Sequence, residues 1–311
     1  MDTLDIGSMI QPFSDEQIHR DEGYYCWGPN LLKAEDGRYY MAYSRWPKAT
    51  GVGGWLTDSE IALAVADQPV GPYTHLSVLL QGRGPGHWDE LMAHNPKLKC
   101  FDGRYYLYYI SSRPGPTKGH IRDSQRTGVA VSDSLTGPYT RFDEPIVVPA
   151  PPIYNVAVNP GVTRMADGRY LLIIKGDVTP KEPTEPFPQR LQALGIGESP
   201  MGPFTFLPDP AIADIDTEDA SIWYDAWRNV YYAVFHAHKY IGLIASDDGI
   251  AWRRAQHYTI TEKRLLKTDG SSLEPQRLER PSVFVEDGEP KVLCLGGSRE
   301  DDWYCVLLPL G

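Results

Sequence analysis

Short apolar runs alternate with turn residues along the whole chain, and one polar opening recurs five times. The openings lie at Gly28-Pro29, Asn95-Pro96, Asn159-Pro160, Asp219-Ala220 and Arg280-Pro281, at intervals of 60 to 67 residues. Repeats of this length in a chain of strands are typical of a propeller, in which each repeat folds into one blade. The pattern therefore predicts five blades, with the opening pair at the start of each first strand.

Each apolar run leads to a tight turn and then to a tyrosine-rich strand. Asp-Gly forms this turn at Asp36, Asp102, Asp167 and Asp287, and Arg228-Asn229 replaces it in the fourth repeat. Asp-Gly supplies the positive φ that a two-residue hairpin needs. The second strands are predicted at 38–44, 104–111, 169–175, 230–236 and 291–296, and their tyrosines are expected to pack within the blades.

The fifth repeat is too short to complete its own sheet, because its last apolar run, 303–308, ends the chain. A closed propeller leaves no unpaired edge at its last blade. We therefore expect a strand within 9–25 to complete that sheet. The fold class is all-β, a five-bladed β-propeller, and 1–311 is expected to be a single domain.

This order of strands places the long connections at the same end as the openings. They are 45–58, 113–124 and 176–188, whereas the turns at the other end are short. First strands of blades line the central channel, so the five openings converge at one mouth. Long loops over a rigid scaffold commonly carry binding and catalysis.

The composition of the chain limits the classes of partner that it can bind. The chain has 311 residues and a formal net charge of −11, which makes nucleic acid an unfavourable partner because phosphate binding needs a basic face. No apolar run approaches the roughly 20 residues of a membrane span, and no signal peptide is expected at the start. The four cysteines lack metal-ligand spacing, and the sequence shows neither a metal site nor a cofactor motif, which leaves open a channel ion held by histidine and carboxylates. A bacterial cytoplasm is expected, or the periplasm or exterior if a leader was removed; the oligomeric state stays open.

The residues at the predicted mouth suit a sugar. Carboxylates can act as acid and base, amides and cations can bind hydroxyls, and an indole can stack on a ring. Converging like charges in a partly dry funnel are expected to raise the pKa of at least one carboxyl. The candidates are Trp27, Arg45, Glu60, Trp88, Asp89, His94, Asn95, Asn159, Lys175, Glu218, Asp219, His236, Glu279 and Arg280.

Several of the candidates also have a structural interpretation. Glu279 and Arg280 could form an ion pair that holds the fifth blade, and Asp89 could only order a loop. Arg45 and Lys175 could neutralise channel carboxylates. His94 could be a satisfied polar core residue, and Asp219 could cap the opening of its strand. The openings differ between repeats, however, and a purely structural repeat would not need five different openings.

The residues also resemble a known group. The polar pair of each inner strand, the tyrosine-rich second strands and local strings such as Ser44-Arg45-Trp46-Pro47, Trp88-Asp89 and His94-Asn95-Pro96 resemble five-bladed propeller glycosidases of glycoside hydrolase families 43 and 117. The resemblance covers nearly the whole chain. Family 43 implies a base Asp in the first blade, a pKa-tuning Asp in the third and an acid Glu in the fourth. This chain has Gly28, Asn159 and Glu218-Asp219 there.

The resemblance implies an exo-acting glycoside hydrolase that releases a terminal sugar from a plant or algal oligosaccharide. Glu218 or Asp219 is the expected acid, and Asp89, Glu279 or Glu60 the expected base, while family 117 keeps His94 and His236 as possible acids. The tryptophans would stack on the sugar, and a basic rim suggests an anionic one. The alternatives are a non-catalytic carbohydrate-binding propeller and a glycoside phosphorylase.

Overall fold

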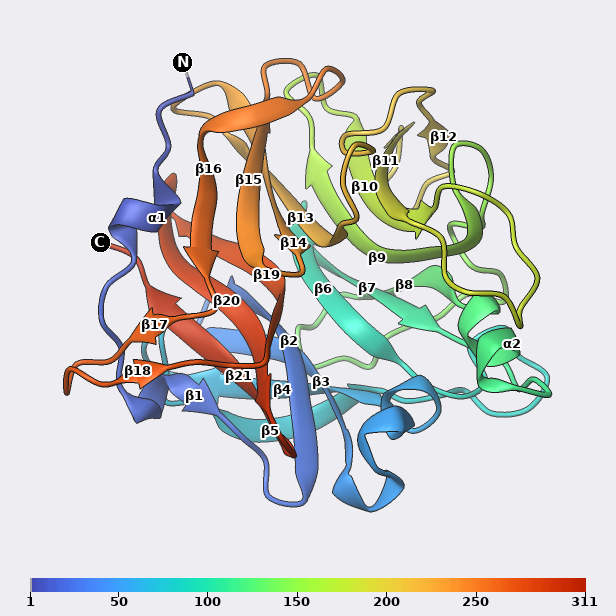
Figure 1. The fold of residues 1–311 in the computed structure, drawn as a ribbon, viewed down its shortest axis with the longest axis horizontal. Coiled ribbons are helices and arrows are strands. Elements are labelled where there is room, and N and C mark those ends of the chain that lie inside the picture. Colours follow the sequence, from blue (N-terminus) through green and yellow to red (C-terminus); the bar gives the residue numbers. More distant parts are fainter. Residues whose placement is uncertain (1) are drawn as a thin grey trace.

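A computed structural model describes residues 2–311 and contains five sheets arranged around a central axis (Figure 1). The first three blades follow the chain order. Blade 1 contains β2 (Tyr24–Lys33), β3 (Tyr39–Pro47), β4 (Glu60–Ala66) and β5 (Thr74–Leu80). Blade 2 contains β6 (His94–Phe101), β7 (Arg104–Ser111) and β8 (Arg126–Ser132). Blade 3 contains β9 (Tyr154–Arg164), β10 (Tyr170–Asp177), β11 (Arg190–Gly197) and β12 (Thr205–Phe206).

The last two blades enclose a small insertion. Blade 4 contains β13 (Glu218–Asp225), β14 (Val230–Ala237), β15 (Tyr240–Ser246) and β16 (Arg253–Glu262), and a hairpin of β17 (Leu265–Leu266) and β18 (Ser272–Leu273) follows. Blade 5 contains β19 (Arg277–Glu286), β20 (Glu289–Arg299), β21 (Asp302–Pro309) and β1 (Ile18–His19). The prediction of an all-β, five-bladed propeller is confirmed.

The N-terminal segment closes the propeller as expected. β1 pairs antiparallel with β21, so the fourth strand of blade 5 comes from the start of the chain. Ahead of it, the segment runs along the outside of the last blades, where blue lies against orange and red in Figure 1. Leu4, Ile6 and Phe13 bury their side chains in the hydrophobic cluster shared by blades 4 and 5. This burial ties the two ends of the chain together.

The recurring pairs begin one residue after the start of β6 and β13, close to the predicted position, but three to five residues after the start of β19, β2 and β9, where the prediction was wrong. In each strand the pairing register shifts at the pair, which identifies a β-bulge. The first residue of each pair has a positive φ: Gly28 64°, Asn95 55°, Asn159 57°, Asp219 65° and Arg280 56°. Gly, Asn and Asp accept this left-handed conformation most readily. Because a bulge re-aims its side chain, the repeated motif turns four polar side chains toward the axis.

The connections at one end carry the remaining short helices. They are η2 (Lys48–Thr50) and η3 (Val52–Leu56) between β3 and β4, and α2 (Lys118–Asp123) between β7 and β8. α1 (Ile6–Met9) and η1 (Asp15–Gln17) belong to the N-terminal segment. In the described part of the chain, none of the helices has the length and apolarity needed to span a membrane.

Candidate active site

A pocket of about 340 Å³ lies where the five inner strands and the long connections meet. Nine of the residues predicted from the sequence line it: Trp27, His94, Asn95, Asn159, Lys175, Glu218, Asp219, Glu279 and Arg280. The connections add Trp55, Leu56, Lys118, Arg122, Gln125 and Phe187, and strand residues add Trp46, Ile110, Val158, Arg190, Arg277 and Trp303. The expectation that openings and long loops share one mouth is therefore confirmed.

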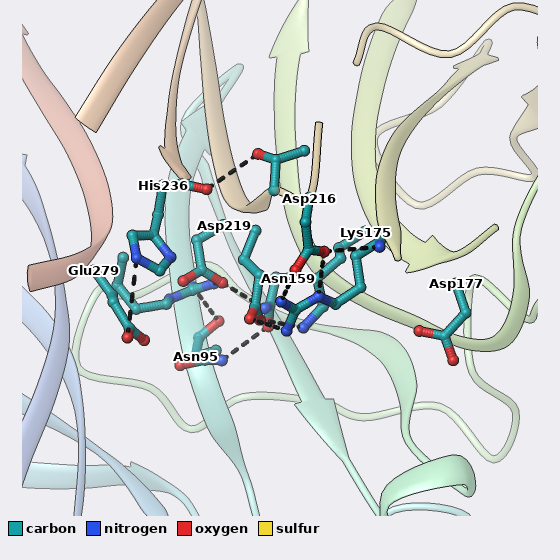
Figure 2. A network of polar contacts seen from close by, with 12 residues as sticks. Asn95, Asn159, Lys175, Asp177, Asp216, Asp219, His236 and Glu279 are labelled. Carbon is teal, nitrogen blue, oxygen red and sulfur yellow. Dashed lines mark hydrogen bonds and ion pairs between the residues drawn. The ribbon is translucent and has the colours of Figure 1, made fainter. Parts of the chain in front are cut away.

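The bulge residues form a hydrogen-bonded floor across the axis. Asn95 Nδ2 donates to Asn159 Oδ1 at 2.8 Å, and Asn159 Nδ2 donates to Asp219 Oδ1 at 2.5 Å (Figure 2). Arg280 donates to the same Asp219 oxygen at 3.1 Å and to the Asn95 carbonyl oxygen at 3.3 Å. A Cβ on Gly28 would lie 3.4 Å from Arg280 Nε, so the Arg280 side chain occupies the space beside this glycine. Four blades thus close the channel beneath the pocket.

Glu218 lies between two cations on one wall. Its Oε2 accepts from Lys175 Nζ at 2.6 Å, and its Oε1 accepts from Arg190, which also pairs with Asp216. Burial opposes the ionisation of Glu218, but the positive charges of Lys175 and Arg190 outweigh it and lower the pKa of this carboxyl. The expectation of a raised pKa is wrong for Glu218, because the sequence did not show that two cations share its oxygens.

Figure 2 shows Glu279 next to His236, on the side of Asp219 that is away from Lys175. Arg277 donates to both oxygens of Glu279 at 2.8 and 3.1 Å, and His236 Nε2 is 4.0 Å from Oε1. His236 is 1% exposed, and burial lowers its pKa, so the ring is neutral at pH 7, and neither of its nitrogens has a hydrogen-bond partner within residues 2–311. The His236 side chain does not line the pocket, whereas Glu279 does.

Aromatic side chains form the wall on the side of blades 1 and 5. Trp303 packs against Trp27 and Trp46 with ring centroids 4.8 and 5.6 Å apart, and Trp55 lies 5.4 Å from His94. His94 Nδ1 is 2.7 Å from the Ser59 hydroxyl, which leaves Nε2 for the pocket. Burial lowers the pKa of His94 well below its ordinary value, with a further contribution from Arg280, so the ring is neutral at pH 7. An apolar wall thus faces a charged one.

Trp88 and Asp89 do not overhang the mouth, and this expectation needs correction. Asp89 is fully buried, accepting from Arg83 at 2.7 Å, from Arg141 at 3.2 Å and from the Tyr109 hydroxyl at 2.8 Å. Trp88 stacks on the same Tyr109 ring with centroids 5.6 Å apart. Two arginines and a tyrosine hold this loop against blade 2, away from the pocket.

Arg45 and Glu60 also lie outside the pocket. Side chains alternate along a strand, and since Trp46 faces the pocket, the neighbouring Arg45 points to the other face of its sheet. There Arg45 donates to Glu60 at 2.8 Å and to Asp21 at 2.9 Å. Burial opposes ionisation of Asp21, but hydrogen bonds from His19, Tyr43 and Arg45 lower its pKa. Three residues of the second strands were expected at the rim, and only Lys175 lines the pocket, so the expectation is wrong for Arg45 and His236.

Half of the pocket residues that the sequence did not single out come from the connections and half from strands. Trp55, Lys118, Arg122 and Phe187 all belong to the segments expected to cover the mouth. Their position in those segments was the only signal for them. Arg277 lies two residues before Glu279 on β19, the spacing that brings side chains to one face of a strand.

One group of residues at and beside the pocket has donors suitable for a metal ion. Ligand atoms of Asp219, His236 and Glu279 lie within 4.8 Å of one another. His19, Asp21 and Cys26 form a second such group, away from the pocket. Arg280 and Arg277 already pair with the two pocket carboxylates, so a metal ion would compete with both arginines.

Comparison with known proteins finds the fold but no sequence family. No family model matches the chain, and no curated protein matches it. Solved structures do match over almost its whole length. A structure described as a BT0996 RGII complex is 15% identical, with a TM-score of 0.71, over 97% of this chain and 92% of that one.

Two further matches are described as glycoside hydrolases. Zg3597, a family 117 enzyme from the marine bacterium Zobellia galactanivorans, is 14% identical with a TM-score of 0.66, over 96% of this chain and 87% of that one. CoXyl43, a family 43 β-xylosidase/α-arabinofuranosidase from a compost microbial metagenome, was solved with xylotriose. It is 17% identical with a TM-score of 0.64, over 99% and 96% of the two chains. These likenesses establish that the chain shares the five-bladed fold of these enzymes.

Proposed function

We propose that this protein is an exo-acting glycoside hydrolase that releases a terminal sugar from an acidic plant or algal oligosaccharide. The observation that carries the proposal is the pocket itself: the carboxylates of Glu218, Asp219 and Glu279 face a tryptophan wall at one end of the propeller axis. Sugars present apolar ring faces and polar edges, which these two walls match. The enzymes that share the fold add support from analogy.

The shape of the pocket favours exo action. Its floor is closed by the side chains of Asn95, Asn159, Asp219 and Arg280, so a chain cannot pass through the channel. The volume of about 340 Å³ is near the lower end of small-molecule pockets, which span about 300–1,000 Å³. A site of this size suits the end of a saccharide chain.

The ionisation of Glu218 assigns the chemical roles. A carboxylate held ionised by Lys175 and Arg190 can accept a proton from water but is a poor proton donor. We therefore assign Glu218 as the base and the pair of Asp219 and Glu279 as the source of the acid. This reverses the role that the family resemblance implies for a fourth-blade glutamate. It also removes the need for a first-blade aspartate, where the chain has Gly28.

The carboxylate variants test the reaction. We expect the wild type to release one monosaccharide from one end of acidic plant or algal oligosaccharides, analysed by chromatography over days. Glu218→Gln, Asp219→Asn and Glu279→Gln should each lower kcat by about 100-fold or more. Glu144→Gln is the control, because this exposed carboxylate does not line the pocket. Full activity in all three pocket variants would contradict the proposal.

Substrates with different leaving groups distinguish the catalytic acid from the catalytic base. An aryl glycoside whose leaving group needs no protonation should restore activity to a variant that lacks the acid, but not to one that lacks the base. We expect rescue in Asp219→Asn or Glu279→Gln and none in Glu218→Gln. Rescue of Glu218→Gln would instead return the acid role to Glu218.

A non-catalytic carbohydrate-binding propeller is the alternative. It is favoured by one observation: all three pocket carboxylates are paired with arginine or lysine, and two positions that carry aspartates in family 43 are Gly28 and Asn159. Glycan binding by calorimetry with no product after days would support it. Turnover only in the presence of phosphate would instead identify a glycoside phosphorylase.

A further inference from the structure

The outer side of the pocket is built by two connections that are fixed to each other. Arg122 of α2 donates to both oxygens of the fully buried Asp177, at the end of β10, at 2.6 and 2.8 Å. Gly119 packs against the following loop so closely that a Cβ there would lie 1.9 Å from the Pro183 carbonyl oxygen. Blades 2 and 3 therefore present one rigid surface at the mouth.

Phe187 extends from this surface over the pocket. Its side chain lines the pocket but is 61% exposed, and cations lie against its ring, with Arg122 4.6 Å and Lys181 5.4 Å from the centroid. Both distances are within the range of cation–π attraction. Single exposed aromatics are common on protein surfaces, but this ring is held in place and lies beside polar groups that lack partners.

Two polar groups that lack partners among the described residues line the same side of the pocket as Phe187. Gln125 is 4% exposed, and its Nε2 has no hydrogen-bond acceptor. Among the pocket-lining cations of residues 2–311, Lys118 is also the only one with no carboxylate in ion-pair distance. The cations deeper in the pocket already have carboxylate partners. A negative charge on the ligand would therefore be stabilised most by an ion pair with Lys118.

We propose that Lys118, Gln125 and Phe187 form an outer subsite for a uronic acid residue, next to the terminal sugar. The inference rests on the proposed function, because it places the second sugar of the same substrate. Phe187 stacks on the ring, Lys118 pairs with the carboxylate, and Gln125 Nε2 donates to a sugar oxygen. The acidic group thus lies on the neighbouring sugar, outside the deep part of the pocket.

Calorimetric binding of galactosyl-galacturonate, which has a neutral terminal sugar, and of its methyl ester tests this subsite. We expect Phe187→Ala to weaken binding of both ligands about tenfold, the effect of one lost stacking contact. Lys118→Gln should weaken binding of the acid about three- to fivefold, as an exposed ion pair does, and leave binding of the ester unchanged. Trp227→Ala and Lys239→Gln are matched controls, because these exposed residues do not line the pocket.

Three results would overturn the inference. They are wild-type binding of neither ligand, equal affinity of wild type and Phe187→Ala, and equal effects of Lys118→Gln on acid and ester. Because binding is measured without turnover, the two proposals can fail separately. Binding that depends on Phe187 and Lys118 in a protein that releases no sugar from any substrate would retain the subsite and reject the hydrolase.

Discussion

At the scale of single residues, neighbouring charges decide what each carboxylate can do. Glu218 is half-buried and Asp89 is fully buried, and each pairs with two cations, yet only Glu218 faces the pocket. The partners of Glu218 lie 43 and 28 residues away in the chain, so only the folded sheets bring them together. The ionisation of Glu218 thus depends on the assembled pocket wall. The pH dependence of the protein's stability can test this.

The stability difference between wild type and Glu218→Gln should depend on pH. The pKa of Glu218 in the folded protein is below its ordinary value of 4.5, so its ion pairs stabilise the fold above pH 4.5 and are lost as the pH falls toward the lowered pKa. At pH 7 we expect the variant to be about 2–3 kcal/mol less stable in urea unfolding. The difference should shrink below pH 4.5.

Glu144→Gln serves as the reference for the same titration, since Glu144 is exposed and has no ion pair in the described chain. Its stability difference from wild type should be within about 0.5 kcal/mol at every pH. A Glu218→Gln difference that stays constant or grows on acidification would contradict the lowered pKa.

At the scale of elements, the bulge in each inner strand links the fold to the site. It places one residue per blade in the left-handed region and, in blades 2 to 5, turns the side chain of that residue toward the axis. Asn159 meets both demands, because asparagine tolerates this conformation and its amide bonds Asn95 and Asp219. Backbone conformation and hydrogen bonding at this position can be separated by substitution.

Asn159→Gly should be more stable than Asn159→Ala, although both lose the same hydrogen bonds. Alanine must adopt a φ of 57°, which costs about 1–2 kcal/mol, whereas glycine adopts it freely but orders a more flexible chain. We expect a net difference of about 1 kcal/mol in urea unfolding.

The same two substitutions at Asn30 are the control. This residue lies on the same kind of strand, is 6% exposed and does not have a positive φ. There the order should reverse, because glycine inside a strand is about 0.5–1 kcal/mol worse than alanine. If the alanine variant were more stable than the glycine variant at both sites, the bulge would not require a left-handed backbone conformation.

At the scale of the whole molecule, the N-terminal segment closes the ring. Only two residues of β1 pair with β21, so the burial of side chains ahead of it contributes much of the closure. Phe13 is fully buried, and its backbone also bonds Leu266 and Thr268 in the β17–β18 hairpin region. The segment therefore connects the last blade to the insertion that precedes it.

Phe13→Ala should destabilise the protein by about 3–5 kcal/mol, because it removes a large side chain from a packed core. Phe142→Ala is the matched control, since Phe142 is 40% exposed, and it should cost less than about 1 kcal/mol in the same urea unfolding experiment. Similar effects of the two substitutions would mean that the N-terminal segment does not contribute to closure.

The sequence by itself determined the propeller, its five inner strands and most of the channel floor. Those features follow from short-range rules: the period of the openings, the positive φ of Asp-Gly turns, and the alternation of apolar residues. The bulge pairs were visible as a motif, but their place inside the strands was not, because register depends on the partner strand.

The tertiary structure decided which polar residues meet. Arg45 lies opposite Cys26, two residues before the bulge residue Gly28, whereas Lys175 lies opposite Val158, one residue before Asn159, so the two side chains leave opposite faces of their strands. Arg45 therefore pairs with Asp21 and Glu60 outside the pocket, and Lys175 pairs with Glu218 inside it. Phe187 and Lys118 come together only because α2 and the β10–β11 loop pack against each other. Ion pairing and packing join residues far apart in the chain, and local sequence preferences do not contain that information.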